Sequence, residues 1–192
     1  MKQINKYIWG HLKNPNFSIV ERLHINKDIG NRHYNYHPKT RDELKELVDQ
    51  LIEERGNDAD LNDIDTSSIT DMHHLFFKSK FNGDISEWNV SNVEDMNTMF
   101  MGSKFTGKNG DISNWDVSNV KDMDYMFYMS NFNGDISEWN VSNVKDMTSM
   151  FEESKFTGEN GDISNWDVSN VEDMYGMFDN SPLEKNTPKW YK

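Results

Sequence analysis

Acidic side chains are the groups in this sequence best able to do chemistry, and they recur at fixed intervals along the chain. Paired carboxylates can act as general acid and general base. Here they return at the same position in successive repeats, which is typical of a structural pattern rather than an active site. The chain also lacks Cys, a G-x-x-x-x-G-K phosphate loop and an H-E-x-x-H zinc motif. We therefore predict a protein that is not an enzyme.

Two histidine pairs have spacings that suggest a metal site. His33 and His37 are four residues apart, but Pro38 follows directly and disfavours a helix that would aim both rings at one ion. His73 and His74 are adjacent, so on a helix they would point in different directions. We expect no metal at either pair and no cofactor elsewhere.

The segment 131–135, Asn-Phe-Asn-Gly-Asp, resembles the start of a calcium-binding loop. Such a loop needs a bidentate Glu at its twelfth position, and the twelfth residue here is Ser142. This segment is therefore not predicted to bind calcium. Calcium held by stacked columns of Asp stays an open alternative.

The net charge of the chain is strongly negative and unevenly placed. The 20 Lys and Arg against 33 Asp and Glu give 20 − 33 = −13. Residues 1–59 carry ten basic and nine acidic residues, whereas the remaining 133 carry ten and 24. Binding to nucleic acid requires clustered cations, so nucleic acid is excluded as a direct partner.

No segment has the features of an export signal or a membrane span. Apolar residues near Met1 are interrupted by polar ones every two or three positions, and no apolar run reaches transmembrane length. The absence of Cys excludes a lipid attached to that residue. These features predict a cytoplasmic protein. A cell-surface location is the alternative if an export signal has been removed from the chain.

The dominant feature of the sequence is a repeat. The segment Asp84–Phe100 recurs with its Asp at positions 111, 135 and 162, at spacings of 27, 24 and 27 residues. A degenerate copy begins at Asp60, and the extra residues of longer copies lie in a connecting loop containing Asn-Gly, which is a turn signal. We predict five repeats, 60–83, 84–110, 111–134, 135–161 and 162–180, followed by a tail, 181–192.

Each repeat contains two apolar patterns. Ile85-x-x-Trp88-x-Val90 resembles the frame of a short strand in leucine-rich repeats, with its apolar side chains pointing inward. Ser91-x-x-Glu94 is typical of a helix-capping box, and apolar residues at 93, 96, 99 and 100 form one helical stripe. We therefore predict a strand, a turn and a short helix in each unit. Neighbouring units must stack to bury their apolar residues.

Residues 1–59 are predicted to form a cap on this stack. Thr40-Arg41-Asp42-Glu43 is a second capping box, and the apolar stripe that follows ends at Gly56, so we expect an amphipathic helix over 41–55. Residues 1–33 are expected to be mixed helix and strand. The predicted fold is an α/β repeat solenoid, a leucine-rich-repeat-like stack of about five strand-turn-short-helix units with an N-terminal, mainly helical cap.

The motif D-I-S-x-W-x-V-S-N-V-x-D-M-x-x-M-F, taken from residues 84–100, resembles the BspA-type leucine-rich-repeat proteins of bacteria. The resemblance covers residues 60 to about 180. It implies a right-handed stack of repeats and, as in many members, a surface-displayed binding or adhesion role. It implies no catalytic residue.

A partner is expected to bind at the positions that flank the Trp of each repeat, because strand side chains alternate in direction. Six of these ten residues are acidic, four are Asn, and none is basic. We call them the predicted face. They are Asp63, Asp65, Glu87, Asn89, Asn114, Asp116, Glu138, Asn140, Asn165 and Asp167.

This acidic surface suggests a non-catalytic protein-binding module that occupies the basic surface of a partner. One such partner is a nucleic-acid enzyme. By occupying the basic surface of that enzyme, the chain would act as an intracellular inhibitor of the anti-defence or anti-CRISPR type. The alternatives are an adhesion or scaffold protein of the BspA type, and a solvated surface that only keeps the protein soluble. The sequence leaves the partner's identity and the oligomeric state open.

Overall fold

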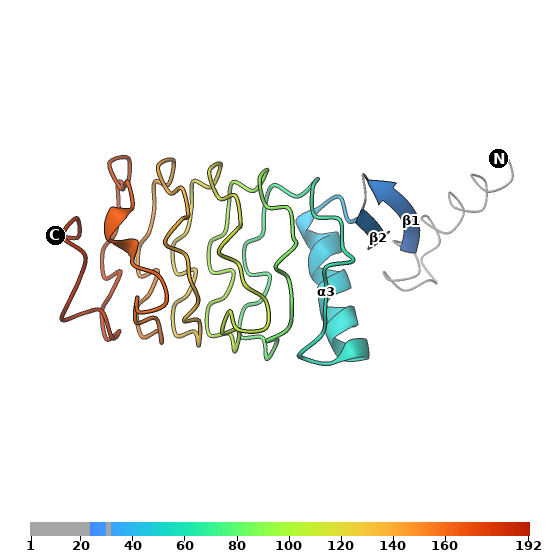
Figure 1. Ribbon diagram of the computed structural model, residues 1–192, viewed down its shortest axis with the longest axis horizontal. Helices are drawn as coiled ribbons and strands as arrows, with labels where there is room; N and C mark the ends of the chain where they lie inside the picture. The colour runs from blue at the N-terminus through green and yellow to red at the C-terminus, as the bar shows by residue number, and fades with distance from the viewer. Residues whose placement is uncertain (1–23, 30–31) are drawn as a thin grey trace, which may run out of the picture.

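The computed structural model describes residues 24–29 and 32–192, and it shows a row of stacked coils with a helix at one end (Figure 1). Strand β1 (His24–Ile29) pairs antiparallel with β2 (Arg32–Tyr36) beyond that helix. The expectation for residues 1–33 lies outside the described residues except at this hairpin.

Helix α3 (Arg41–Arg55) covers the residues where the sequence predicted a helix. The Thr40 hydroxyl accepts a hydrogen bond from the Glu43 N–H, so the capping box begins the helix as expected. The helix ends at Gly56, whose φ of +92° favours a residue without a side chain. Its apolar stripe, which is buried, comprises Leu44, Leu47, Val48 and Leu51.

The coils are built from turns, and the predicted strand-turn-short-helix solenoid is wrong. Among the described residues, α3 is the one α-helix, and the repeats add only a three-residue 3₁₀ helix, η1 (Ile163–Asn165). Neighbouring repeats are joined by single parallel β-bridges, such as Asp71 with Asp95, rather than by paired strands. The mainly helical cap is also incorrect, because the described part of residues 1–59 includes the β1–β2 hairpin.

Backbone geometry explains why the helical stripe does not form a helix. Thr98, in the middle of the stripe, has a φ of +53°, and the equivalent residue of every repeat is also left-handed. A left-handed residue interrupts a right-handed helix after a single turn. The capping box is absent as well, since the Ser91 N–H and hydroxyl both donate to Asn89 Oδ1. The equivalent left-handed residues are His74, Tyr125, Ser149 and Gly176.

One segment of each coil forms a regular ladder of backbone hydrogen bonds with the next coil, and we call it the arc. Alternate N–H groups of one arc donate to carbonyl oxygens of the next, so these N–H groups point towards the C-terminal end of the stack. In the first junction the donors are Met72, His74, Phe76 and Lys78, and the acceptors are Asp95, Asn97, Met99 and Met101, at 2.8 to 3.1 Å. The five arcs are residues 71–78, 95–102, 122–129, 146–153 and 173–180.

The core consists of columns in which the same side chain stacks from coil to coil. Ring centroids along one Phe column are 5.3, 5.5, 5.6 and 5.8 Å apart, with nearly parallel planes. Offset aromatic stacking at such distances stabilises each junction in addition to burial. The column comprises Phe76, Phe100, Phe127, Phe151 and Phe178.

The predicted tail, 181–192, continues the stack. Trp190 lies 24 residues after Trp166, which is one of the two repeat spacings. Its ring stacks 6.3 Å from that of Trp166, and its indole N–H donates to the Ile163 carbonyl as each earlier indole donates to its own preceding coil. The Trp190 spacing was readable in the sequence and was missed there.

Candidate functional site

The structure separates the ten residues of the predicted face into two groups. Asp63 and Asp65 contact the N-terminal elements. Arg55 makes two hydrogen bonds of 3.0 Å to the Asp63 carboxylate, and His37 Nδ1 lies 3.0 Å from Asp65, which is buried. Burial opposes ionisation of Asp63, but the bonds from Arg55 and Asn35 outweigh it and hold its pKa below the usual value.

The other eight residues are exposed and form two columns along the stack. Within each column an acid alternates with Asn, because the repeat has a longer period of two units. No acid therefore follows another acid in a column, which limits like-charge repulsion along it. One column is Glu87, Asn114, Glu138 and Asn165, and the other is Asn89, Asp116, Asn140 and Asp167.

The second of these columns has a structural role. Asp116 Oδ1 accepts hydrogen bonds from the Ser118 N–H at 3.1 Å and from its hydroxyl at 2.6 Å, forming a turn. Asn89, Asn140 and Asp167 accept from the Ser two residues later in the same way. A shallow groove of about 400 Å³ brings four residues of the predicted face together: Glu138, Asn140, Asn165 and Asp167.

The arcs offer a second surface, which the sequence reasoning did not identify. Within D-M-x-x-M-F-x-x, the Asp and Phe are constant, whereas the four x positions differ from coil to coil. We call the side chains at these positions the arc face. A repeated scaffold with variable positions on one face could have been recognised from the sequence alone. The variable residues are His73-His74 and Phe77-Lys78, Asn97-Thr98 and Met101-Gly102, Asp124-Tyr125 and Tyr128-Met129, Thr148-Ser149 and Glu152-Glu153, and Tyr175-Gly176 and Asp179-Asn180.

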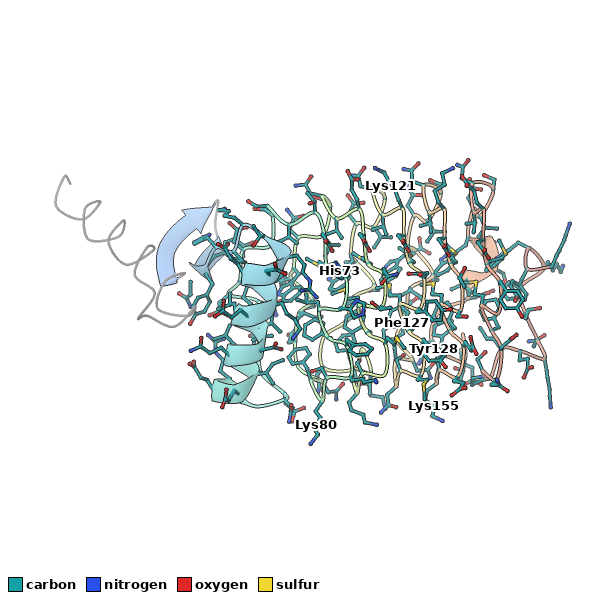
Figure 2. The ribbon with its side chains drawn as sticks, turned by 180° about the vertical axis from the view of Figure 1, so that it is seen from behind. His73, Lys80, Lys121, Phe127, Tyr128 and Lys155 are labelled. Carbon is teal, nitrogen blue, oxygen red and sulfur yellow. The ribbon has the colours of Figure 1, made fainter. Side chains whose placement is uncertain are left out.

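The arc face carries the exposed large apolar side chains of the described chain. Phe77 is 36% exposed, Met129 52% and Tyr175 80%, and no other large apolar side chain from residue 34 onward is as open. The Tyr125 and Tyr128 rings meet edge to face at 5.6 Å beside Met129. In Figure 2, His73 and Tyr128 lie between Lys121 at one edge of the stack and Lys80 and Lys155 at the opposite edge.

Carboxylates line up where the arcs begin. The bridging residues are Asp71, Asp95, Asp122, Asp146 and Asp173. Burial, together with the charges of Asp122 and Asp71, raises the pKa of Asp95. Burial and the nearby Asp122, Asp146 and Asp95 carboxylates raise the pKa of Asp124 to about 7.

One group in the described part of the chain has side chains suited to holding a metal ion. It consists of Asp71, His73 and Asp95, whose ligand atoms lie within 4.8 Å of one another. The adjacent histidines, which lie in a turn rather than on the helix assumed from the sequence, have different partners. His73 Nδ1 faces Asp71 Oδ1 at 2.7 Å, whereas His74 Nδ1 faces the Thr98 hydroxyl at 2.7 Å. The side chain of His33 lies outside the described residues.

A family model described as "Mycoplasma protein of unknown function, DUF285" matches residues 43–157 and 104–191. No curated protein and no solved structure matches the chain. These comparisons neither support nor reject the resemblance to BspA-type proteins. Across the residues with described structure, no helix is both long enough and apolar enough to cross a membrane.

Proposed function

Because the chain belongs to the DUF285 family, whose function is unknown, we propose a function from its geometry: it is a non-catalytic protein-binding module that uses the arc face. The observation that carries the proposal is that the exposed apolar side chains Phe77, Met129 and Tyr175 all belong to arcs, where the residues also vary. Exposed apolar side chains set among polar ones are typical of interaction sites.

The chemistry of the arc face suggests the character of the partner. The third arc carries Tyr125, Tyr128 and Met129. The fourth arc, one coil further on, carries the acids Glu152 and Glu153. Tyr and Met contribute large contact areas, and the acids favour a cationic rim. We expect a partner that inserts apolar side chains and surrounds them with Lys or Arg.

The predicted face supports a second candidate function. Its eight exposed residues include four acids and no base, and four of them line one groove. They would suit a basic surface on a nucleic-acid enzyme, as in a cytoplasmic anti-defence or anti-CRISPR inhibitor. An adhesion or scaffold role at the cell surface, of the BspA type, is the alternative.

The arc-face proposal is tested by affinity capture from lysate of the source cells with matched variants. The double variant Tyr128→Glu, Met129→Glu copies Glu152 and Glu153, so the scaffold already accepts these residues in the next coil. We expect a specific partner to be retained by the native chain and lost by this variant. Binding of the purified partner is then measured, with at least about tenfold weakening expected if Tyr128 is a central contact.

The second candidate is tested in parallel by Asp116→Lys with Glu138→Lys. A partner that is lost by this variant but retained by the arc-face variant would contradict the proposal and favour the acidic inhibitor. Inhibition of that partner's nuclease activity would then identify it as a nucleic-acid enzyme. A wall or envelope component retained through the predicted face would favour adhesion.

A further inference from the structure

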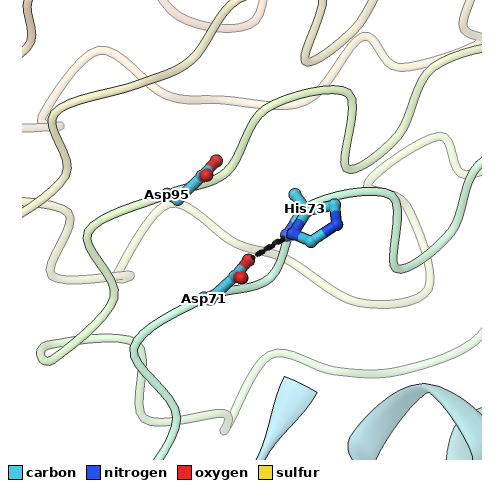
Figure 3. A group of neighbouring side chains, drawn as sticks. All are labelled: Asp71, His73 and Asp95. Carbon is cyan, nitrogen blue, oxygen red and sulfur yellow. Dashed lines mark hydrogen bonds and ion pairs between the residues drawn. The ribbon is translucent and has the colours of Figure 1, made fainter. Parts of the chain in front are cut away.

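We propose that Asp71, His73 and Asp95 bind a single zinc ion at the N-terminal end of the arc face. Their ligand atoms lie within 4.8 Å of one another, and Figure 3 shows Asp71 and Asp95 side by side on two neighbouring coils, with His73 facing Asp71. Two carboxylate oxygens and one imidazole nitrogen would leave one position for water in a four-coordinate site. This inference does not depend on the proposed protein-binding function.

The fold places the three residues together through the junction of the first two arcs. Asp71 and Asp95 are paired in a parallel β-bridge, so their carboxylates lie side by side. His73 follows Asp71 by two residues, and its N–H donates to Asp71 Oδ1 at 2.9 Å, which holds the turn and directs the ring to the carboxylate.

The carboxylates retain lone pairs for an ion. Asp95 Oδ1 accepts from the Asn97 N–H at 2.8 Å, and Asp71 Oδ1 accepts the bonds from His73. The second oxygen of each carboxylate, Oδ2, accepts no hydrogen bond from any described residue. In the metal-bound state His73 Nδ1 would direct its lone pair to the ion in place of a hydrogen bond to Asp71.

The electrostatic surroundings favour a divalent cation. The Asp122 carboxylate of the next arc adds to the negative charge beside Asp95. Arg41 lies beside the site, where its guanidinium donates two hydrogen bonds to the His73 carbonyl. A bound cation would reduce the mutual repulsion of the Asp71, Asp95 and Asp122 carboxylates.

The ligand set favours zinc over calcium or magnesium, because those two ions prefer oxygen ligands alone. The site is also confined to one junction. The position of His73 is taken in the later arcs by Asn97, Asp124, Thr148 and Tyr175, so those coils lack the imidazole. We therefore expect one zinc ion per chain.

Titration of the full chain with Zn²⁺ by calorimetry tests the proposal. We expect one site per chain, and a loss of at least about tenfold in affinity in His73→Asn, since even residues that only support a metal ligand contribute that much. Asn97 occupies this position in the next coil, so the variant keeps the fold. His74→Asn is the matched control, because its ring faces Thr98 instead, and it should bind as the native chain does.

Cobalt gives a second measurement that does not rely on heat. Co²⁺ bound by a nitrogen and two oxygens should show visible absorption bands that Asp95→Asn and His73→Asn remove. Absence of stoichiometric binding to the native chain would overturn the proposal. Equal affinity of the native chain and both site variants would also overturn it, by placing the ion elsewhere.

Discussion

The Asp124 carboxyl group makes the stability of the stack depend on pH. Burial and three neighbouring carboxylates raise its pKa from 3.8 to about 7. Between these values the folded chain holds a proton that the unfolded chain has lost, so stability falls as pH rises through this range and then levels off above it. We expect the melting temperature to decrease from about pH 5 to about pH 8, and Asp124→Asn to flatten that decrease.

Asp116→Asn is the matched control for this prediction. It removes the same charge from the same coil, and Asn already occupies the equivalent position in both neighbouring coils, at residues 89 and 140. Asp116 is exposed and lies in a turn rather than among carboxylates. The assignment to Asp124 fails if thermal melts of the two variants show the same pH dependence.

Left-handed residues are a second feature at the residue scale. Glu153 has a φ of +53° although it carries a side chain, whereas Gly102 occupies the same position two coils earlier. Glu153→Gly relieves the steric strain but increases the freedom of the unfolded chain, which leaves a net gain of roughly 0.5–1 kcal/mol. Chemical denaturation should detect this gain. Glu159→Gly, at an exposed position without positive φ, should give none.

At the scale of the element, the corners of the coils depend on close backbone packing. A Cβ added to Gly110 would lie 2.9 Å from both the Gly83 carbonyl oxygen and the Ile85 nitrogen. These are backbone atoms, which cannot move without displacing the coil. We expect Gly110→Ala to destabilise the chain by about 1–3 kcal/mol, as overpacking does. Denaturation of Lys108→Ala, in the same loop but exposed, should match the native chain.

The elements also show which parts of the fold the sequence could predict. Helix α3 was predicted correctly because its cap, its apolar stripe and its terminal Gly all act locally. The arcs were predicted wrongly because their apolar spacing is also helical, and periodicity alone does not reveal left-handed residues such as Thr98. Contacts between coils, rather than local propensity, fix the arc conformation.

The candidate sites also differ in how far the sequence could predict them. The predicted face was recognisable from its position beside Trp, but the use of Asp116 in a turn and of Asp63 in an ion pair required coordinates. The arc face was readable as variation within the repeat. The meeting of Asp71 with Asp95 was not predictable without knowing that residues 24 apart form a bridge.

At the scale of the whole molecule, the two ends of the stack are chemically different. Because every arc directs N–H groups one way, carbonyl oxygens face the N-terminal end, where Arg41 donates to the His73 carbonyl and α3 covers the first coil. At the opposite end, the fifth arc presents N–H groups that have no acceptor in the described part of the chain. These belong to Met174, Gly176, Phe178 and Asn180.

An added coil should therefore stabilise the molecule. Replacing Lys192 with a copy of residues 141–151 continues the register, because Trp190 then precedes the copied Val by two residues, as Trp139 precedes Val141. The new arc offers carbonyls to three of these N–H groups, those of Met174, Gly176 and Phe178, and a ring to Phe178. We therefore expect a higher melting temperature from the added junction. The same extension with Ser at its copied Val144, Met147, Met150 and Phe151 cannot bury a core and should leave the melting temperature unchanged. Equal melting of the two extended chains would mean that the fifth arc is already a closed end, with Trp190 and Tyr191 completing the stack.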